Sequence, residues 1–255
     1  LMAACSSQPE SGYTVNVTVT GDLAQLPNDT LVLTGGTRKA PVADTVVLVN
    51  GKATFKGETT TPTYYRLTFN GKKAIKNIFL ENAKYNVTFD AADPAKAVVE
   101  GGDIQSFISS MNAKRDELYA AAKLDSLMKV YGKLSDEEKA AVREAYNNAE
   151  KQISEMNDAY LAANPASAYA LYTVASTIGD IPVAELDAKL ATFDTMAVYA
   201  NNELLKDAKE TAALIKSLQP GNKAPDFVQN DPDGKPVKFS DIYSKNKLTM
   251  IDFWA

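Results

Sequence analysis

The sequence predicts an α+β protein with an N-terminal antiparallel β sandwich or barrel, a central helical segment and a shorter C-terminal region. Apolar residues alternate with polar ones as far as residue 102, recur at intervals of three and four as far as residue 218, and change pattern again after Gln219-Pro220-Gly221. Periods of two and 3.6 are typical of strands and helices. The expected parts are a tether at 1–12, a β domain at 13–102, a helical domain at 103–220 and a C-terminal region at 221–255.

The β domain begins at residues 13–20, where Tyr13, Val15, Val17 and Val19 alternate with polar residues, as in a half-buried strand. Asn50-Gly51 and Asn70-Gly71 each separate two strand-like runs, and both residue types tolerate the positive φ of a tight hairpin. The short, regular spacing is typical of a sandwich or barrel. Further strands are expected at residues 30–33, 45–49, 53–56, 64–69, 75–80, 85–89 and 97–99.

Two long amphipathic helices are expected after Gly101-Gly102, at residues 103–134 and 135–164. Ser135 and Glu138 have the spacing of a capping box, which predicts that the second helix begins there. Met and Tyr residues at helical spacing are interpreted as core, and the acidic excess of this region as a solvated face. Shorter helices are expected at residues 167–177, 183–200 and 202–218.

The composition excludes several classes of function. The 255 residues contain no His and one Cys, which removes Ser-His-Asp and Cys-His nucleophilic sites, zinc sites with His or Cys ligands and any intramolecular disulfide. Neither a metal nor another cofactor is expected. The 27 basic and 32 acidic residues form no basic patch with interleaved aromatics, so nucleic acid is not an expected partner. No run reaches the roughly twenty apolar residues that span a bilayer.

The N-terminus carries a cysteine behind small residues, in the order Leu1-Met2-Ala3-Ala4-Cys5-Ser6-Ser7. This run resembles the end of a bacterial lipoprotein signal peptide, in which the cysteine receives a diacylglycerol and becomes the mature N-terminus. The alternative is that Cys5 is a small buried side chain, but the polar residues that follow provide no core. The resemblance implies lipid attachment at Cys5 and a periplasmic or cell-envelope location, and Ser6 favours the outer membrane.

The last residues resemble the start of TlpA/ResA-type thiol:disulfide interchange proteins, of the AhpC/TSA and thioredoxin superfamily. Three runs carry this resemblance: Gly221-Asn222-Lys223-Ala224-Pro225-Asp226-Phe227, Asp233-Gly234-Lys235-Pro236-Val237-Lys238-Phe239-Ser240-Asp241-Ile242 and Lys247-Leu248-Thr249-Met250-Ile251-Asp252-Phe253-Trp254-Ala255. In the family, the first two form a small strand, a turn and a helix, and an apolar strand ending Phe-Trp-Ala then leads to Trp-Cys-x-x-Cys. That cysteine pair is expected directly after Ala255.

Asp252 matches the position of a buried acid that helps to move the proton of the cysteine pair in thioredoxins, and the resemblance implies the same role here. Many TlpA-like members lack this acid. The alternative is an ordinary polar residue in an exposed half-strand. We also expect residues 221–255 to be poorly ordered, or docked on the rest of the chain, because the strand at 248–255 has no sheet beside it.

The β domain resembles a domain of unknown function that precedes thioredoxin-like domains in many Gram-negative envelope lipoproteins. The residues that carry this resemblance are the hairpin at 44–57, the run Asn77-Ile78-Phe79-Leu80-Glu81 and the exit Val99-Glu100-Gly101-Gly102. The main hypothesis is the N-terminal portion of a lipid-anchored thiol:disulfide oxidoreductase that acts on client or redox-partner proteins. The alternative is a non-catalytic binding or scaffold lipoprotein with a degenerate thioredoxin-like module. A peroxiredoxin-like peroxidase is disfavoured by the Phe-Trp-Ala ending.

Overall fold

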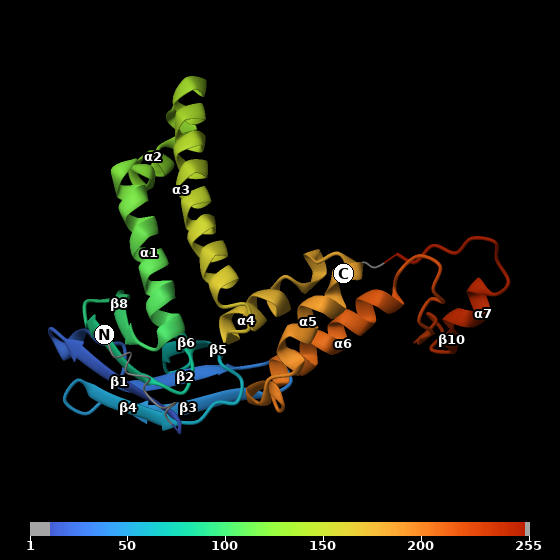
Figure 1. Ribbon diagram of the computed structural model, residues 1–255, viewed down its shortest axis with the longest axis horizontal. Helices are drawn as coiled ribbons and strands as arrows, with labels where there is room; N and C mark the ends of the chain where they lie inside the picture. The colour runs from blue at the N-terminus through green and yellow to red at the C-terminus, as the bar shows by residue number, and fades with distance from the viewer. Residues whose placement is uncertain (1–10, 253–255) are drawn as a thin grey trace, which may run out of the picture.

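The computed structural model describes residues 11–252 and has a mixed α+β architecture (Figure 1). Two four-stranded sheets at the N-terminal end are followed by helices and by a small two-stranded sheet. The strands of the two larger sheets are β1 (Tyr13–Thr20), β2 (Thr30–Gly36), β3 (Pro41–Val47), β4 (Lys52–Gly57), β5 (Thr63–Phe69), β6 (Lys73–Leu80), β7 (Lys84–Asp90) and β8 (Asp93–Gly101). The α+β prediction is therefore confirmed.

The two larger sheets have the strand orders β4-β1-β7-β8 and β3-β2-β5-β6. Within the described residues they are not closed into a barrel, so the sandwich is the correct one of the two predicted architectures. Neighbouring strands are antiparallel except β1 and β7, which run parallel with Val17 opposite Val87. The predicted antiparallel sandwich is thus confirmed apart from this one parallel pair, which an alternating pattern cannot reveal because it marks a strand without recording the direction of its neighbour.

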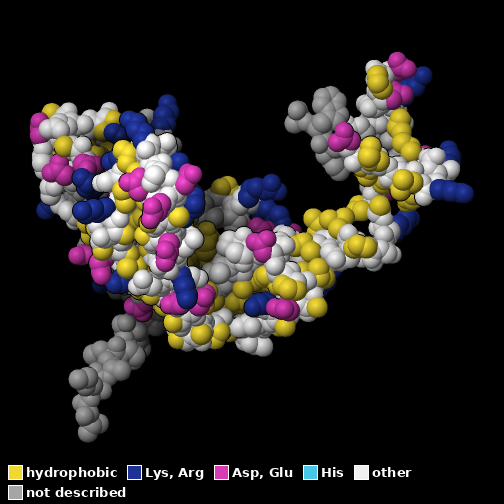
Figure 2. Space-filling view, turned by 90° about the horizontal axis from the view of Figure 1, so that it is seen from above, with side chains coloured by type: hydrophobic (Ala, Val, Ile, Leu, Met, Phe, Trp, Pro, Cys, Tyr) yellow, Lys and Arg dark blue, Asp and Glu magenta, His cyan; other side chains and the backbone are white. Residues whose placement is uncertain are grey.

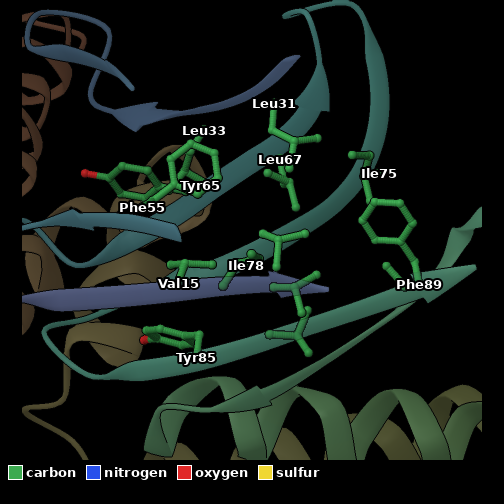
Figure 3. Packing of buried hydrophobic residues seen from close by; sticks show 14 of the residues in the cluster. Val15, Leu31, Leu33, Phe55, Tyr65, Leu67, Ile75, Ile78, Tyr85 and Phe89 are labelled. Atoms are coloured by element: carbon green, nitrogen blue, oxygen red, sulfur yellow. The ribbon is translucent and has the colours of Figure 1, made fainter. Parts of the chain in front are cut away.

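Apolar side chains from the two sheets point toward one another and form the main core (Figure 3). Val15, Phe55, Leu67 and Tyr85 are completely buried there, and the alternation predicted for β1 is seen as buried Tyr13, Val15, Val17 and Val19. Burial of these side chains provides most of the stabilisation of the sandwich, at about 25 cal/mol per Å² of apolar surface.

Both predicted Asn-Gly turns are confirmed. Asn50 and Gly51 have φ values of 51° and 72°, and Asn70 and Gly71 have 46° and 69°. Two successive residues with positive φ give a turn whose twist matches that of the flanking strands. These turns fix the β5–β6 hairpin and the connection into β4.

The first predicted long helix is broken. Residues 103–134 form α1 (Asp103–Ala121), α2 (Leu124–Lys129) and the short turn η2 (Tyr131–Lys133), rather than one helix. The break is at Lys123, which adopts the left-handed region with φ 53°. Leu124 is consequently redirected into a buried position against α3 (Asp136–Ala163), and this tertiary contact outweighs the local helical preference.

The start of α3 is confirmed as a capping box. The Ser135 hydroxyl accepts from the Glu138 N–H at 3.2 Å, and the Glu138 carboxylate accepts from the Ser135 N–H at 2.7 Å. Two backbone donors of the first turn are thereby satisfied. Along the helix, the Glu150 carboxylate accepts from Arg115 at 3.1 Å and from the Tyr119 hydroxyl at 2.7 Å, which joins α3 to α1.

The remaining helices form a second unit with its own apolar core. The predicted helix at 183–200 is shorter, because 3-10 turns occupy both of its ends. The elements are α4 (Ala168–Ser176), η3 (Ile178–Asp180), η4 (Val183–Glu185), α5 (Leu186–Asp194), η5 (Ala197–Tyr199) and α6 (Glu203–Ser217). Among the described residues, no helix is both long enough and apolar enough to cross a membrane.

The hairpin of α1 and α3 projects from the sandwich, whereas α4, α5 and α6 extend in another direction (Figure 1). The two directions meet at Phe79 on the outer face of β6. Its ring makes edge contacts with Tyr64, Tyr169 and Tyr172, with centroid distances of 5.2, 5.8 and 5.9 Å. Such edge-to-face aromatic pairs contribute about 0.5–1.5 kcal/mol each beyond burial.

The α6 helix is tied to the sandwich at its first turn. Asn202 is buried; its Oδ1 accepts from the Leu205 N–H at 2.9 Å, and its Nδ2 donates to the Thr60 carbonyl at 3.1 Å. Lys39, in the β2–β3 turn, forms an ion pair with Asp207 at 2.8 Å and a second one with Glu210. The helix that leads into the C-terminal region is therefore fixed on the β domain.

Candidate functional site

The C-terminal region contains a small hairpin of β9 (Val228–Asn230) and β10 (Pro236–Lys238), followed by the short helix α7 (Phe239–Tyr243). Asp226 accepts from the Ser240 N–H at 2.8 Å and ion-pairs with Lys238 at 3.3 Å. Hydrogen bonding to Ser240 is the main cause that lowers the pKa of Asp226. The Phe227 and Phe239 rings stack with centroids 4.9 Å apart. The Asp-Phe pair of the motif therefore joins the start of the hairpin to the start of α7.

The Gly-Lys turn of the motif is also formed. The Asp231 carboxylate accepts from the N–H groups of Asp233 and Lys235 at 3.0 and 2.8 Å, and Gly234 has φ 79°. A positive φ at this position is strained for any residue with a Cβ, so glycine suits the turn. The strand, turn and helix that the resemblance implied are thus present as local structure.

Asp252 is exposed and lies outside any regular strand or helix. The apolar residues before it are exposed as well, at 89% for Leu248 and 86% for Met250. The side chains of Leu248 and Met250 are thus not docked on the rest of residues 11–252. A buried, proton-accepting Asp252 stays a prediction. Cys5 lies outside the described residues, so lipid attachment there stays a prediction.

The face shown in Figure 2 has acidic and basic side chains interspersed over the helical hairpin, and apolar side chains gathered toward the C-terminal region. Among residues 11–252 no group of three or more Asp, Glu, His or Cys side chains could hold a metal ion. Two features of the described residues are therefore candidates for a functional site: the exposed C-terminal region and the cavities.

A cavity of about 540 Å³ lies where the sandwich is open, between β6, β8 and α1. One wall is the edge strand β6 with Lys76 and Asn77, and the other is α1 with Asn112 and Asp116. A second cavity of about 350 Å³ adjoins it and shares Lys76 and Asn77. A hollow thus follows the outer edge of β6.

Side chains form hydrogen bonds with some of the backbone groups on the outer edge of β6. The Gln105 side chain accepts from the Phe79 N–H at 2.8 Å. The Tyr85 hydroxyl donates to the Phe79 carbonyl at 3.2 Å and accepts from the Glu81 N–H at 2.8 Å. Burial raises the pKa of Tyr85, so the hydroxyl keeps its proton and can donate. The outward backbone groups at Phe79 and Glu81 are therefore not free to pair with another strand.

Glu81 holds the first turn of α1. Its carboxylate accepts from the Ile104 N–H at 3.1 Å, whereas the residue before the helix, Gly102, has no side chain to cap it. Burial is the main cause that raises the pKa of Glu81, and the hydrogen bond from Ile104 opposes this shift. A negative charge at a helix N-terminus is favourable, so the carboxylate of Glu81, from the β domain, stabilises the N-terminus of α1.

The sequence did not reveal this cavity. Ile104, Ile108 and Met111 were recognisable as a helical apolar face, but Gln105 is buried beside them and reads as an ordinary surface residue. A polar residue next to an apolar stripe was the one available signal. This signal could not show that Gln105 accepts from the N–H of Phe79, in a strand more than twenty residues earlier.

The fold therefore defines a class, an open β sandwich that continues directly into a helical hairpin. Comparison with known families gives the more particular result: residues 13–106 match the model of a family described as Domain of unknown function (DUF4369). The match agrees with the expected relation of the β domain to a domain of unknown function. No curated protein and no solved structure matches the chain.

Proposed function

We propose that this chain provides the lipid-anchored β domain, the helical segment and the first elements of the redox domain of a thiol:disulfide oxidoreductase of the cell envelope. The observation that carries the proposal is the C-terminal motif: Asp226 and Phe227 join the β9–β10 hairpin to α7 in the order that the thioredoxin-like resemblance implies. The matched β domain at residues 13–106 supports it, because the same order of parts is expected in such lipoproteins.

The proposed chemistry is exchange through a mixed disulfide. In the reducing direction, one thiolate of a cysteine pair attacks a disulfide of a client protein and releases one client thiolate; the second cysteine then attacks the mixed disulfide, so the client is reduced and the pair oxidised. The same steps in reverse order oxidise the client and reduce the pair. The thiolate forms readily where a helix N-terminus lowers the pKa of the thiol. Asp252 would accept or return the proton of the second cysteine.

The β domain and the helices would hold the redox domain away from the membrane. Asn202 and Lys39 fix α6 on the sandwich, and the C-terminal region begins within a few residues of the end of α6. A lipid on Cys5 would attach the opposite end of the chain to the membrane, through the polar tether that ends at Gly12.

The decisive experiment is to read the coding sequence beyond Ala255 and to assay the gene's whole product for reduction of insulin disulfides. A Trp-Cys-x-x-Cys continuation with activity that disappears on changing the first of those cysteines to Ser is expected. A continuation without a cysteine pair would contradict the proposal.

The lipid anchor has its own test in a diderm bacterial host. The Cys5→Ser variant should move from the membrane fraction to the soluble periplasmic fraction, and mass spectrometry of the wild-type N-terminus should show a diacylglyceryl group on Cys5. Ser6→Ala is the matched control and should stay in the membrane fraction. A wild-type protein without lipid would remove this part of the proposal.

A non-catalytic binding lipoprotein is the second candidate. The 540 Å³ cavity favours it, because its lining residues all belong to the β domain, its junction with α1 and α1 itself, and none to the C-terminal region. A whole gene product without cysteines that still binds a ligand at this cavity would support this candidate instead.

A further inference from the structure

The strand β6 is an edge strand, because its one neighbour in the sheet order is β5. Backbone groups in an antiparallel strand point alternately toward and away from the neighbouring strand. The Phe79 N–H points away from β5, since it donates to Gln105. Asn77, two residues earlier, has the same orientation, and the pairing register is regular between the two positions.

The Asn77 N–H and carbonyl therefore face outward along an edge that no strand of residues 11–252 covers. Side chains satisfy the same edge at Phe79 and Glu81, and this protection ends before Asn77. Unpaired groups on an exposed strand edge are a template for pairing with another extended chain. Asn77 also lines both adjoining cavities, so there is room beside the free groups.

The walls of the hollow indicate which kind of molecule fits. Lys76 on one wall and Asp116 on the other form no ion pair within residues 11–252, so the larger cavity carries one charge of each sign, and Arg66 adds a second positive charge in the smaller cavity. Val98, which is 57% exposed, adds apolar surface, and the buried side chain of Ile108 also lines the cavity. A polyanion would be repelled by Asp116, and a purely apolar ligand would leave the charges and the backbone groups of Asn77 unpaired.

We infer that the hollow between β6, β8 and α1 binds an extended segment of polypeptide, which pairs with the free edge of β6 at Asn77 and lies against Val98 and Ile108. Backbone hydrogen bonds give such a complex its affinity independently of sequence, and adjacent side-chain contacts give it a modest preference. This inference goes beyond the proposed redox function and needs no cysteine.

The test uses the full chain and a labelled probe, α-lactalbumin that is reduced and capped with neutral carboxamidomethyl groups, which is unfolded and has no free thiol or disulfide. Fluorescence anisotropy should show saturable binding. Asn77→Pro removes the outward N–H and should weaken binding about tenfold, whereas Asn77→Ala keeps the N–H and should change it less than about twofold.

A second pair of variants tests the cavity without altering β6. Ala113→Arg fills the hollow from the exposed face of α1 and should weaken binding about fivefold, while Ala120→Arg, on the same helix and outside the cavity lining, should have no effect. Binding that is equal for wild type, Asn77→Pro and Ala113→Arg would overturn the inference. So would the absence of binding by the wild type.

Hydrogen exchange keeps the test decisive even if Asn77→Pro does not fold. Addition of the probe to the wild type should slow exchange of the Asn77 amide and leave that of Phe79, which is already bonded, unchanged. Protection confined to residues 247–252 would instead place the probe on the C-terminal region and contradict the inference. Because the probe cannot exchange disulfides, these results are independent of whether the oxidoreductase proposal holds.

Discussion

The β sandwich and the C-terminal region at 221–252 differ in what holds them together. Both have well-formed turns and strand pairing, but the sandwich encloses a large apolar cluster, whereas Phe239 is the one buried side chain among residues 221–252. Turns and hydrogen bonds specify a local shape in either case. The comparison shows that local shape can be specified without the burial that gives a unit its own stability.

The largest expected effect contrasts a phenylalanine from each region. Phe55→Ala empties a fully buried position and should lower the free energy of unfolding by about 3–5 kcal/mol. Phe227→Ala, at a position that is 43% exposed, should change it by less than about 1 kcal/mol. Urea unfolding followed by circular dichroism measures both. Similar losses for the two variants would mean that the C-terminal region belongs to the main cooperative unit.

The next effect separates a buried asparagine from an exposed one. Asn202→Ala removes the cap of α6 and its bond to the Thr60 carbonyl, and should cost about 2 kcal/mol. Asn222→Ala also loses one hydrogen bond, to the Lys216 carbonyl, but at an exposed position, and should cost less than about 0.5 kcal/mol. Thermal unfolding of both variants checks the difference. Equal losses of stability would show that the bonds of Asn202 contribute no more than one exposed hydrogen bond.

A smaller effect is expected at the capping box of α3. Ser135→Ala should destabilise the protein by about 1 kcal/mol near neutral pH. Hydrogen bonds from Ser135 lower the pKa of Glu138, so this contribution is present above the unfolded value of 4.5 and is lost as the pH falls through the folded pKa. Unfolding measured at several pH values should show the difference between variant and wild type becoming smaller in acid, because the hydrogen bond from the Ser135 hydroxyl to the Glu138 carboxylate is lost there, whereas the bond from the Ser135 N–H is present in both proteins. A constant difference would contradict the capping role of Glu138.

The smallest effect has the opposite sign. Burial raises the pKa of Glu81, so its contribution to stability is full below 4.5 and declines as the pH rises through the folded pKa. Glu81→Gln cannot titrate but can still accept from the Ile104 N–H. The stability of wild type relative to this variant should therefore fall between acid and neutral pH. A rise over the same interval would mean that the helix N-terminus outweighs desolvation at this carboxylate.

Local signals in the sequence predicted local structure well. The alternation at Tyr13 to Val19, the positive φ at Asn50 and Asn70 and the capping box at Ser135 each depend on a few neighbouring residues. Features that depend on distant residues were missed or wrong. The break at Lys123, the parallel pairing of β1 with β7 and the bond from Phe79 to Gln105 require contacts that no short pattern records.

The candidate site follows the same division. The C-terminal motif could be read from consecutive residues, and its hairpin and helix formed as the resemblance implied. The hollow along β6 could not be read in this way, because its walls come from β6, β8 and α1 and acquire meaning only when these elements meet. Asn77 looks like any exposed strand residue until its position on an uncovered edge is known.

Because Glu81 accepts a hydrogen bond from the first turn of α1, the β domain and the start of α1 belong to one unit if the domain is recombined into another gene. The family match ends at residue 106, four residues after the end of the β domain expected from sequence, and it therefore includes Ile104 and Gln105. These two residues receive their partners from β6 and from the residue after it. A recombination event at residue 102 would separate both pairs, whereas one at residue 106 would carry a finished sandwich together with the first turn of a helix, to which a different helical partner could be joined.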